Sequence, residues 1–359
     1  MGRRKILHTA TSWALAGLLI ACDATIHEYP QAGTSLVVLE LNIDRTPPAY
    51  HKEIIYDEEW NRTERDLAET AALPYMPEEE YDMRIIVDIY QGNAENHDLA
   101  QRVQRRILYA PNDALPPQDT LHAYLPHGNY HVLAWADYVR RDGKDGSHYQ
   151  ADDLAAILTD TDRYPANTHM RSTAAGSTSF TIDFTRTPEG YPLEEGRIAE
   201  SRIIRILLER PSGRYRLVAS DYDLFTHTGT NPEGLSARVV YQQFVSTGFN
   251  IATGQPNRFE PSYAFGMEAP MAETTDDGSP TLAIDYVFAA QEGETNIVAD
   301  LYLYDREGRE VNRCQGIRIP IRRNHETVVR GHFLTRRQEA GNGVSIDEGF
   351  DGEYVVGID

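Results

Sequence analysis

The stretch Ser35-Leu-Val-Val-Leu-Glu-Leu-Asn-Ile-Asp44 carries the alternation that decides the fold class of this chain. One face of the extended segment carries Val37, Leu39, Leu41 and Ile43. The other face carries Val38, Glu40 and Asn42. A period of two with β-branched side chains predicts a strand that buries one face. The following Thr46-Pro47-Pro48 ends this strand, because proline has no N–H to donate to a ladder.

The same pattern recurs along the rest of the chain. Met83, Ile85, Val87 and Ile89 form a second alternating run. Further strands are predicted at 101–109, 130–139, 178–184, 215–220, 238–247, 281–289, 296–304, 316–321 and 327–334. A short helix is predicted at 152–158, and a short helix or loop within the acidic residues 57–80. Many strands with turn residues between them and little helix predict an all-β chain built from β-sandwiches.

Length and composition narrow the class of protein. The 359 residues suggest about two domains, with a boundary near Glu209-Arg-Pro-Ser-Gly213. The formal charge of −21 disfavours nucleic acid as a partner, because a phosphate backbone would be repelled. The two cysteines exclude a disulfide framework and a zinc site built from cysteines.

The first twenty-two residues predict export and lipid attachment. Gly2-Arg-Arg-Lys5 is cationic, Ile6–Ala21 is mostly apolar, and Leu19-Ile-Ala-Cys22 resembles a bacterial lipobox. We therefore predict a signal peptide at 1–21, a diacylglycerol on the sulfur of Cys22 and a tether at 22–34. The lipid would hold the protein on the outer membrane at the cell surface. The alternative is that Cys22 is an ordinary residue at the end of a conventional signal.

No catalytic or metal-binding motif stands out in the sequence. There is no Gly-x-Ser-x-Gly elbow, and His325-Glu326 lacks the second histidine of a zincin helix. His122, His127 and His131 straddle a turn, so their rings need not converge. We therefore predict a protein that is not an enzyme and has neither a cofactor nor a metal.

From Ser35 onward the chain resembles the fimbrillin-like surface lipoproteins of Bacteroidetes. The resemblance rests, in order, on Cys22 and on the stretches 37–41, 83–90, 125–138, 209–215, 319–331 and 343–353. It implies two tandem transthyretin-like β-sandwich domains, at 35–208 and 209–359. It also implies a fimbrial subunit, anchor or related adhesin, without a cofactor and with other fimbrial subunits as partners.

In that family some subunits lose their first strand by Arg-specific cleavage, and a strand from a neighbouring subunit fills the groove. Here Arg45 follows the first strand directly, so cleavage would leave Thr46 as the new terminus. The C-terminal segment 344–358 is the predicted donor strand, through Val344, Ile346, Tyr354, Val356 and Ile358. Main-chain hydrogen bonds would supply affinity, and alternate side-chain pockets would supply register.

Several alternatives remain open on sequence grounds. A retained first strand would indicate a membrane-bound anchor or a relative that does not polymerise. The C-terminal segment could instead pair within its own domain. A different class of function is a surface module that binds glycans on exposed aromatic rings such as Trp60, Trp135 or Tyr263.

Overall fold

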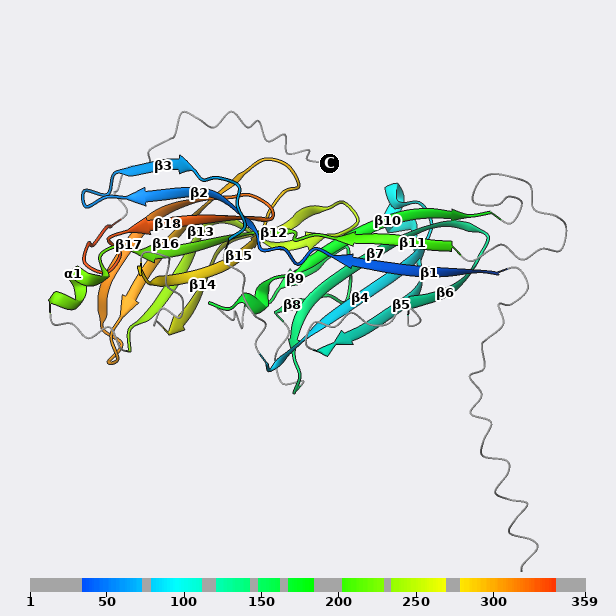
Figure 1. Cartoon of the computed structure of the whole chain (residues 1–359), viewed down its shortest axis with the longest axis horizontal. Coiled ribbons are helices and arrows are strands. Elements are labelled where there is room, and N and C mark those ends of the chain that lie inside the picture. The colour runs from blue at the N-terminus through cyan, green and yellow to red at the C-terminus, as the bar shows by residue number, and fades with distance from the viewer. Residues whose placement is uncertain are drawn as a thin grey trace, which may run out of the picture.

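The computed structural model describes residues 34–72, 79–111, 121–142, 148–161, 167–183, 202–228, 234–268 and 278–339, and the fold given below is that of these residues. They are almost entirely β-structure, which confirms the all-β prediction (Figure 1). Four sheets pack face to face in pairs, so that the molecule consists of two β-sandwiches. The transthyretin-like detail remains a prediction.

The first sandwich pairs a three-stranded sheet with a four-stranded sheet. The three-stranded sheet has the order β11-β1-β6, with β1 at Thr34–Ile43, β6 at His122–Pro126 and β11 at Arg202–Leu208. The four-stranded sheet has the order β10-β7-β4-β5, with β4 at Tyr81–Gln91, β5 at Gln101–Ala110, β7 at Gly128–Arg140 and β10 at Ala174–Ile182. Apolar residues of both sheets, including Val37, Leu39, Ile85 and Val132, meet between them as one core.

The second sandwich contains the other two sheets. Its five-stranded sheet has the order β15-β12-β18-β2-β3, with β2 at Ala49–Tyr56, β3 at Arg62–Asp66, β12 at Ser212–Ala219, β15 at Thr281–Phe288 and β18 at His325–Gly331. The facing sheet has the order β17-β16-β13-β9-β8 with β14 paired to β13; its strands are β8 at Tyr149–Gln150, β9 at Ile157–Thr159, β13 at Ser236–Asn250, β14 at Gln255–Glu268, β16 at Thr295–Tyr304 and β17 at Glu310–Ile321. The helical segments are η1 at Ala94–Leu99, η4 at His169–Arg171 and α1 at Tyr222–His227.

Strand pairing departs from the predicted domain boundaries of 35–208 and 209–359. β2 and β3 come early in the chain, yet β2 pairs in parallel with β18 of the second sandwich. Likewise β8 and β9 join the second sandwich through pairing of β9 with β13. Alternation along a segment identifies a strand but contains no information about its distant partner, which is why the sequence did not reveal this interleaving.

Two local predictions are also wrong. Within residues 57–80, β3 is a fully exposed strand rather than a helix or loop. Within 152–158, turns lead directly into β9, and no helix forms. Both segments take their conformation from pairing with a neighbouring strand, which overrides a weak local preference.

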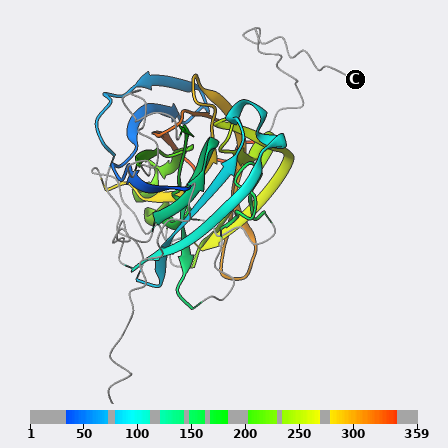
Figure 2. The same ribbon diagram turned by 90° about the vertical axis from the view of Figure 1, so that its right-hand side faces the viewer.

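A third apolar cluster joins the two sandwiches. Outer-face residues of the four-stranded sheet, among them Leu133 and Trp135, pack against Tyr149, Phe249 and Phe288. Figure 2 looks from the free end of the first sandwich, with the strands of the second behind it. The sandwiches are therefore joined by a buried core as well as by the chain that passes between them.

Candidate strand-exchange site

β1 is the middle strand of the three-stranded sheet. Its first half pairs antiparallel with β6, where Ser35 lies opposite Leu125 and Val37 opposite Ala123. From Val37 to Ile43 it pairs in parallel with β11, residues Arg202–Leu208. Removal of β1 would therefore expose main-chain hydrogen-bonding groups on both β6 and β11.

The inward face of β1 supplies part of the first core. Val37 is 0% exposed, Leu39 2% and Ile43 9%, and all three belong to the core cluster of the first sandwich. Burial of an aliphatic side chain of this size contributes about 1.5–3 kcal/mol, so β1 is held by its side chains as well as by its backbone. Ser35 is also fully buried, which makes the first position of the groove a small one.

The outward face of β1 carries an ion pair. The Glu40 carboxylate accepts a hydrogen bond from Nε of Arg205 on β11 at 2.8 Å. Arg205 is largely exposed, so this pair contributes little to stability. It does give one position along β11 at which an acidic side chain on the neighbouring strand can form an ion pair.

The chain leaves β1 through an exposed turn that contains Arg45 and Thr46. The Asp44 carboxylate accepts hydrogen bonds from the Thr46 backbone N–H at 2.9 Å and from the Thr46 hydroxyl at 2.7 Å. The Thr46 carbonyl accepts one from Nη2 of Arg210 at 3.2 Å. The Arg45–Thr46 bond thus lies on the surface, and contacts on both of its sides fix the turn.

Topology makes this turn the single covalent link between β1 and the rest of the described chain. After it, β2 begins at Ala49 in the second sandwich, and the chain returns to the first sandwich at β4 (Figure 1). A cut after Arg45 would therefore separate β1 alone, and β2 would keep its place beside β18.

The other predicted site residues divide into two groups. Cys22 and the donor residues Val344, Ile346, Tyr354, Val356 and Ile358 lie outside the described residues. Arg45 and Thr46 are described and exposed, as a processing site requires.

The three candidate aromatic platforms for a glycan do not form one surface. Trp60 is half-buried and packs on Tyr56, with ring centroids 4.6 Å apart. Trp135 is fully buried between the sandwiches. Tyr263 lies on β14, and its side chain is not among those described.

Titratable groups in the described part of the chain do not assemble into a metal centre. No cluster of three or more potential metal ligands occurs there. Burial, and then the charge of Asp221, raise the pKa of the Cys314 thiol to about 12, so this sulfur stays protonated and is not a nucleophile at neutral pH. The ring of His131 contacts that of His97, with Nε2 of His131 2.8 Å from Nδ1 of His97. No helix in the described residues is long and apolar enough to cross a membrane.

The chain matches the sequence profile of a family of unknown function (DUF6562) over residues 37–358, and it belongs to that family. No curated protein matches it.

Several solved structures resemble the fold at low identity. The fimbrial anchor protein Mfa2 from Porphyromonas gingivalis shares 11% identity, with a TM-score of 0.37 and coverage of 79% of this chain and 82% of that one. A protein provisionally assigned as an adhesin from Bacteroides ovatus shares 10% identity, with a TM-score of 0.39 and coverage of 79% and 76%. One provisionally assigned to cell adhesion from Bacteroides eggerthii shares 11% identity, with a TM-score of 0.36 and coverage of 85% and 89%.

Proposed function

We propose that this protein is a lipid-anchored cell-surface component of a fimbrial or adhesion system, a structural subunit or anchor without enzymatic activity. In this proposal subunits assemble by strand exchange in the groove between β6 and β11. The observation that carries it is the position of β1, a buried central strand whose only described covalent link is an exposed turn containing Arg45. The outer membrane would be reached through a lipid on Cys22.

The groove and the C-terminal segment have matching patterns. Val344-Ser-Ile-Asp347 repeats the order of Val37-Val-Leu-Glu40. In this register Val344 and Ile346 of a second copy would take the pockets of Val37 and Leu39, and Asp347 would face Arg205. Tyr354, Val356 and Ile358 offer a second alternating run in the same segment.

Proteolysis in vitro tests the exchange. We expect an Arg-specific protease to cut the purified protein after Arg45, and the product, beginning at Thr46, to form ladders of oligomers on mild electrophoresis. Cleavage is read by intact mass and N-terminal sequencing. A monomer that keeps the cut β1 fragment would contradict strand exchange.

Matched variants separate cleavage from assembly. Arg45→Lys should resist the Arg-specific enzyme but regain cleavage and ladders with a Lys-specific one. The Lys-specific enzyme has few other sites in the chain, because Lys occurs elsewhere only at 5, 52 and 144. Deletion of residues 340–359 should abolish ladders and leave cleavage unchanged. If ladders persist after this deletion, the C-terminal segment is not the donor.

The form of the protein recovered from cells separates a subunit from an anchor. A start at Thr46 supports a polymerising subunit, and an acylated start at Cys22 supports a tethered anchor. Cys22→Ser should release the protein from the membrane fraction. Recovery of unprocessed Met1 in the cytoplasm would refute the cell-surface proposal.

A further inference from the structure

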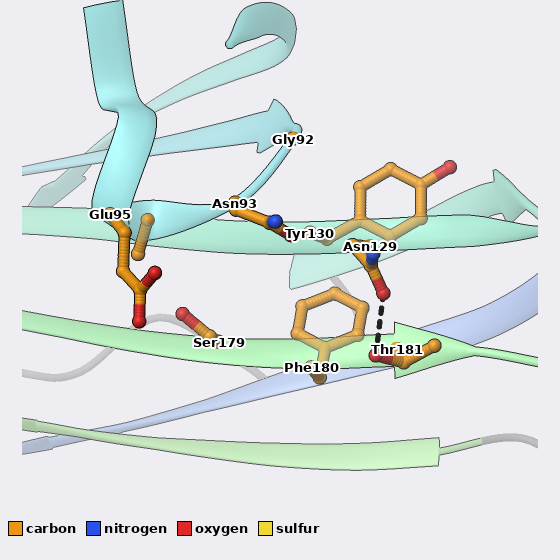
Figure 3. A pocket seen from close by; sticks show the side chains of 9 residues that line it. Gly92, Asn93, Glu95, Asn129, Tyr130, Ser179, Phe180 and Thr181 are labelled. Carbon is orange, nitrogen blue, oxygen red and sulfur yellow. Dashed lines mark hydrogen bonds between the residues drawn. The ribbon is translucent and has the colours of Figure 1, made fainter.

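A pocket of about 420 Å³ with several polar side chains in its lining lies on the four-stranded sheet (Figure 3), at the end far from the second sandwich (Figure 1). Its floor is formed by Asn129 of β7 and by Ser179 and Thr181 of β10. One wall is the segment 92–95, which carries Asn93 and Glu95 from the end of β4 into η1. Its volume falls within the usual range for small-molecule sites.

The side chains of the pocket offer both hydrogen-bond donors and acceptors. The Thr181 hydroxyl donates to Oδ1 of Asn129 at 2.8 Å, which turns the Asn129 amide nitrogen away from Thr181 (Figure 3). Asn93 precedes η1, yet its side chain makes no capping hydrogen bond to that helix. In Figure 3 the Glu95 carboxylate and the Ser179 hydroxyl point toward each other. Amides, a hydroxyl and a carboxylate therefore converge on one space.

The wall of the pocket is held by a buried scaffold. The Gly92 N–H donates to the Asn129 carbonyl at 2.9 Å, and the Gly92 carbonyl lies 3.3 Å from Nδ1 of His131. His131 is 1% exposed, and its ring stacks on Tyr90 with centroids 5.0 Å apart. A Cβ on residue 92 would lie 2.9 Å from that of Ala100, so glycine is needed for this path. The backbone of this wall is thus positioned before any ligand arrives, which lowers the entropic cost of binding.

We propose that this pocket binds a neutral, hydroxyl-rich ring, such as one sugar residue of a glycan. Of the described residues that line the pocket, Glu95 alone is charged, so the site disfavours anions. Vicinal hydroxyls both donate and accept, which matches the mixture of amide, hydroxyl and carboxylate groups.

The proposal is tested with defined probes by saturation-transfer NMR on the purified protein. The probes are the methyl glycosides of glucose, galactose, mannose and N-acetylglucosamine, with methylamine and spermidine as cationic comparisons. We expect at least one glycoside to bind, with a Kd on the order of 1 mM. Failure of all glycosides, or binding of the amines alone, overturns the proposal.

Matched variants locate the binding. Asn129→Ala and Ser179→Ala should each weaken binding about fivefold, the loss of one hydrogen bond. Ser177→Ala lies on the same strand and the same face but outside the pocket, and should leave the affinity unchanged. Glu95→Gln tests the carboxylate of the pocket in the same way. Its control is Asp98→Asn, which removes a carboxylate from the same helical segment but outside the pocket. Equal losses in Ser177→Ala and Ser179→Ala would refute this site.

The sugar site and strand exchange can fail independently. The polar groups of the pocket lie on the sheet opposite β1, so Arg45→Lys should bind the glycoside with unchanged affinity. Conversely, Ser179→Ala should still be cut after Arg45 and form ladders.

Discussion

Protonation of the buried His148 should lower the stability of the fold. His148 is 3% exposed, and its ring stacks on Tyr81 with centroids 5.7 Å apart. Burial, and then the positive charge of Arg171, lower the pKa of His148 to about 3. An unfolded histidine titrates near pH 6.5, so between about pH 6.5 and 3 the unfolded chain binds a proton at His148 that the folded protein does not bind.

This difference in pKa predicts that the folded state becomes less stable as the pH falls. Stability from neutral His148 is fully present above about pH 6.5 and is lost as the pH falls toward 3, by at most about 1.4 kcal/mol per pH unit. Urea unfolding at pH 7, 6 and 5 measures the slope. His148→Gln should flatten it, whereas His127→Gln at an exposed turn should not. An unchanged slope in His148→Gln would show that other groups cause the acid sensitivity.

At the scale of elements, β1 is a strand with a buried face that is joined to the rest of the described chain by one exposed turn. Its buried face contributes to the first core, which opposes its release. β3 behaves in the opposite way: it is an edge strand with every residue exposed and mostly charged. Charged edges of this kind discourage pairing with other chains.

Substitutions on the two faces of β1 should differ in cost. Leu39→Ala should lower the free energy of unfolding by about 2–5 kcal/mol, because it removes fully buried methyl groups. Val38→Ala, on the half-buried outer face, should cost about 1 kcal/mol or less. Chemical denaturation of both variants gives the comparison. Equal costs would mean that β1 does not hold its alternating register.

At the scale of the whole molecule, the aromatic cluster between the sandwiches couples their stability. Phe288 packs against Phe249 at 5.4 Å, Tyr149 at 5.7 Å and Trp135 at 6.4 Å between ring centroids. Because β2, β3, β8 and β9 also cross between the sandwiches in chain order, neither sandwich is a continuous stretch of sequence. We therefore expect the two sandwiches to unfold in one cooperative transition.

Phe288→Ala should weaken this coupling. The lost contacts should cost about 3–5 kcal/mol and split the calorimetric transition into two. Phe259→Ala, at a position that is 50% exposed, is the matched control and should change stability by about 0.5 kcal/mol or less. A single transition in Phe288→Ala would show that the crossing strands alone couple the sandwiches.

Several strands with an apolar face could be predicted from the sequence. Alternation located β1, β4, β7 and β13 because each buries a regular set of side chains. It missed β3, whose sequence Arg62-Thr-Glu-Arg-Asp66 has no apolar face to reveal it, and it also missed β2, β11 and β14. The exposed Arg45 could likewise be predicted from its place after β1, whereas the polar pocket could not, since Asn93, Asn129 and Ser179 come from three separate segments.

The sequence by itself determined the all-β class, the extent of β1 and the presence of an arginine just after it. Local alternation is sufficient for this where a strand, such as β1, has a buried face of its own. The tertiary structure alone decided that β1 is central, that β2 and β3 belong to the second sandwich, and that segment 92–95 closes a pocket over β7 and β10. Strand partners depend on packing between residues more than a hundred positions apart, and no local pattern encodes that choice.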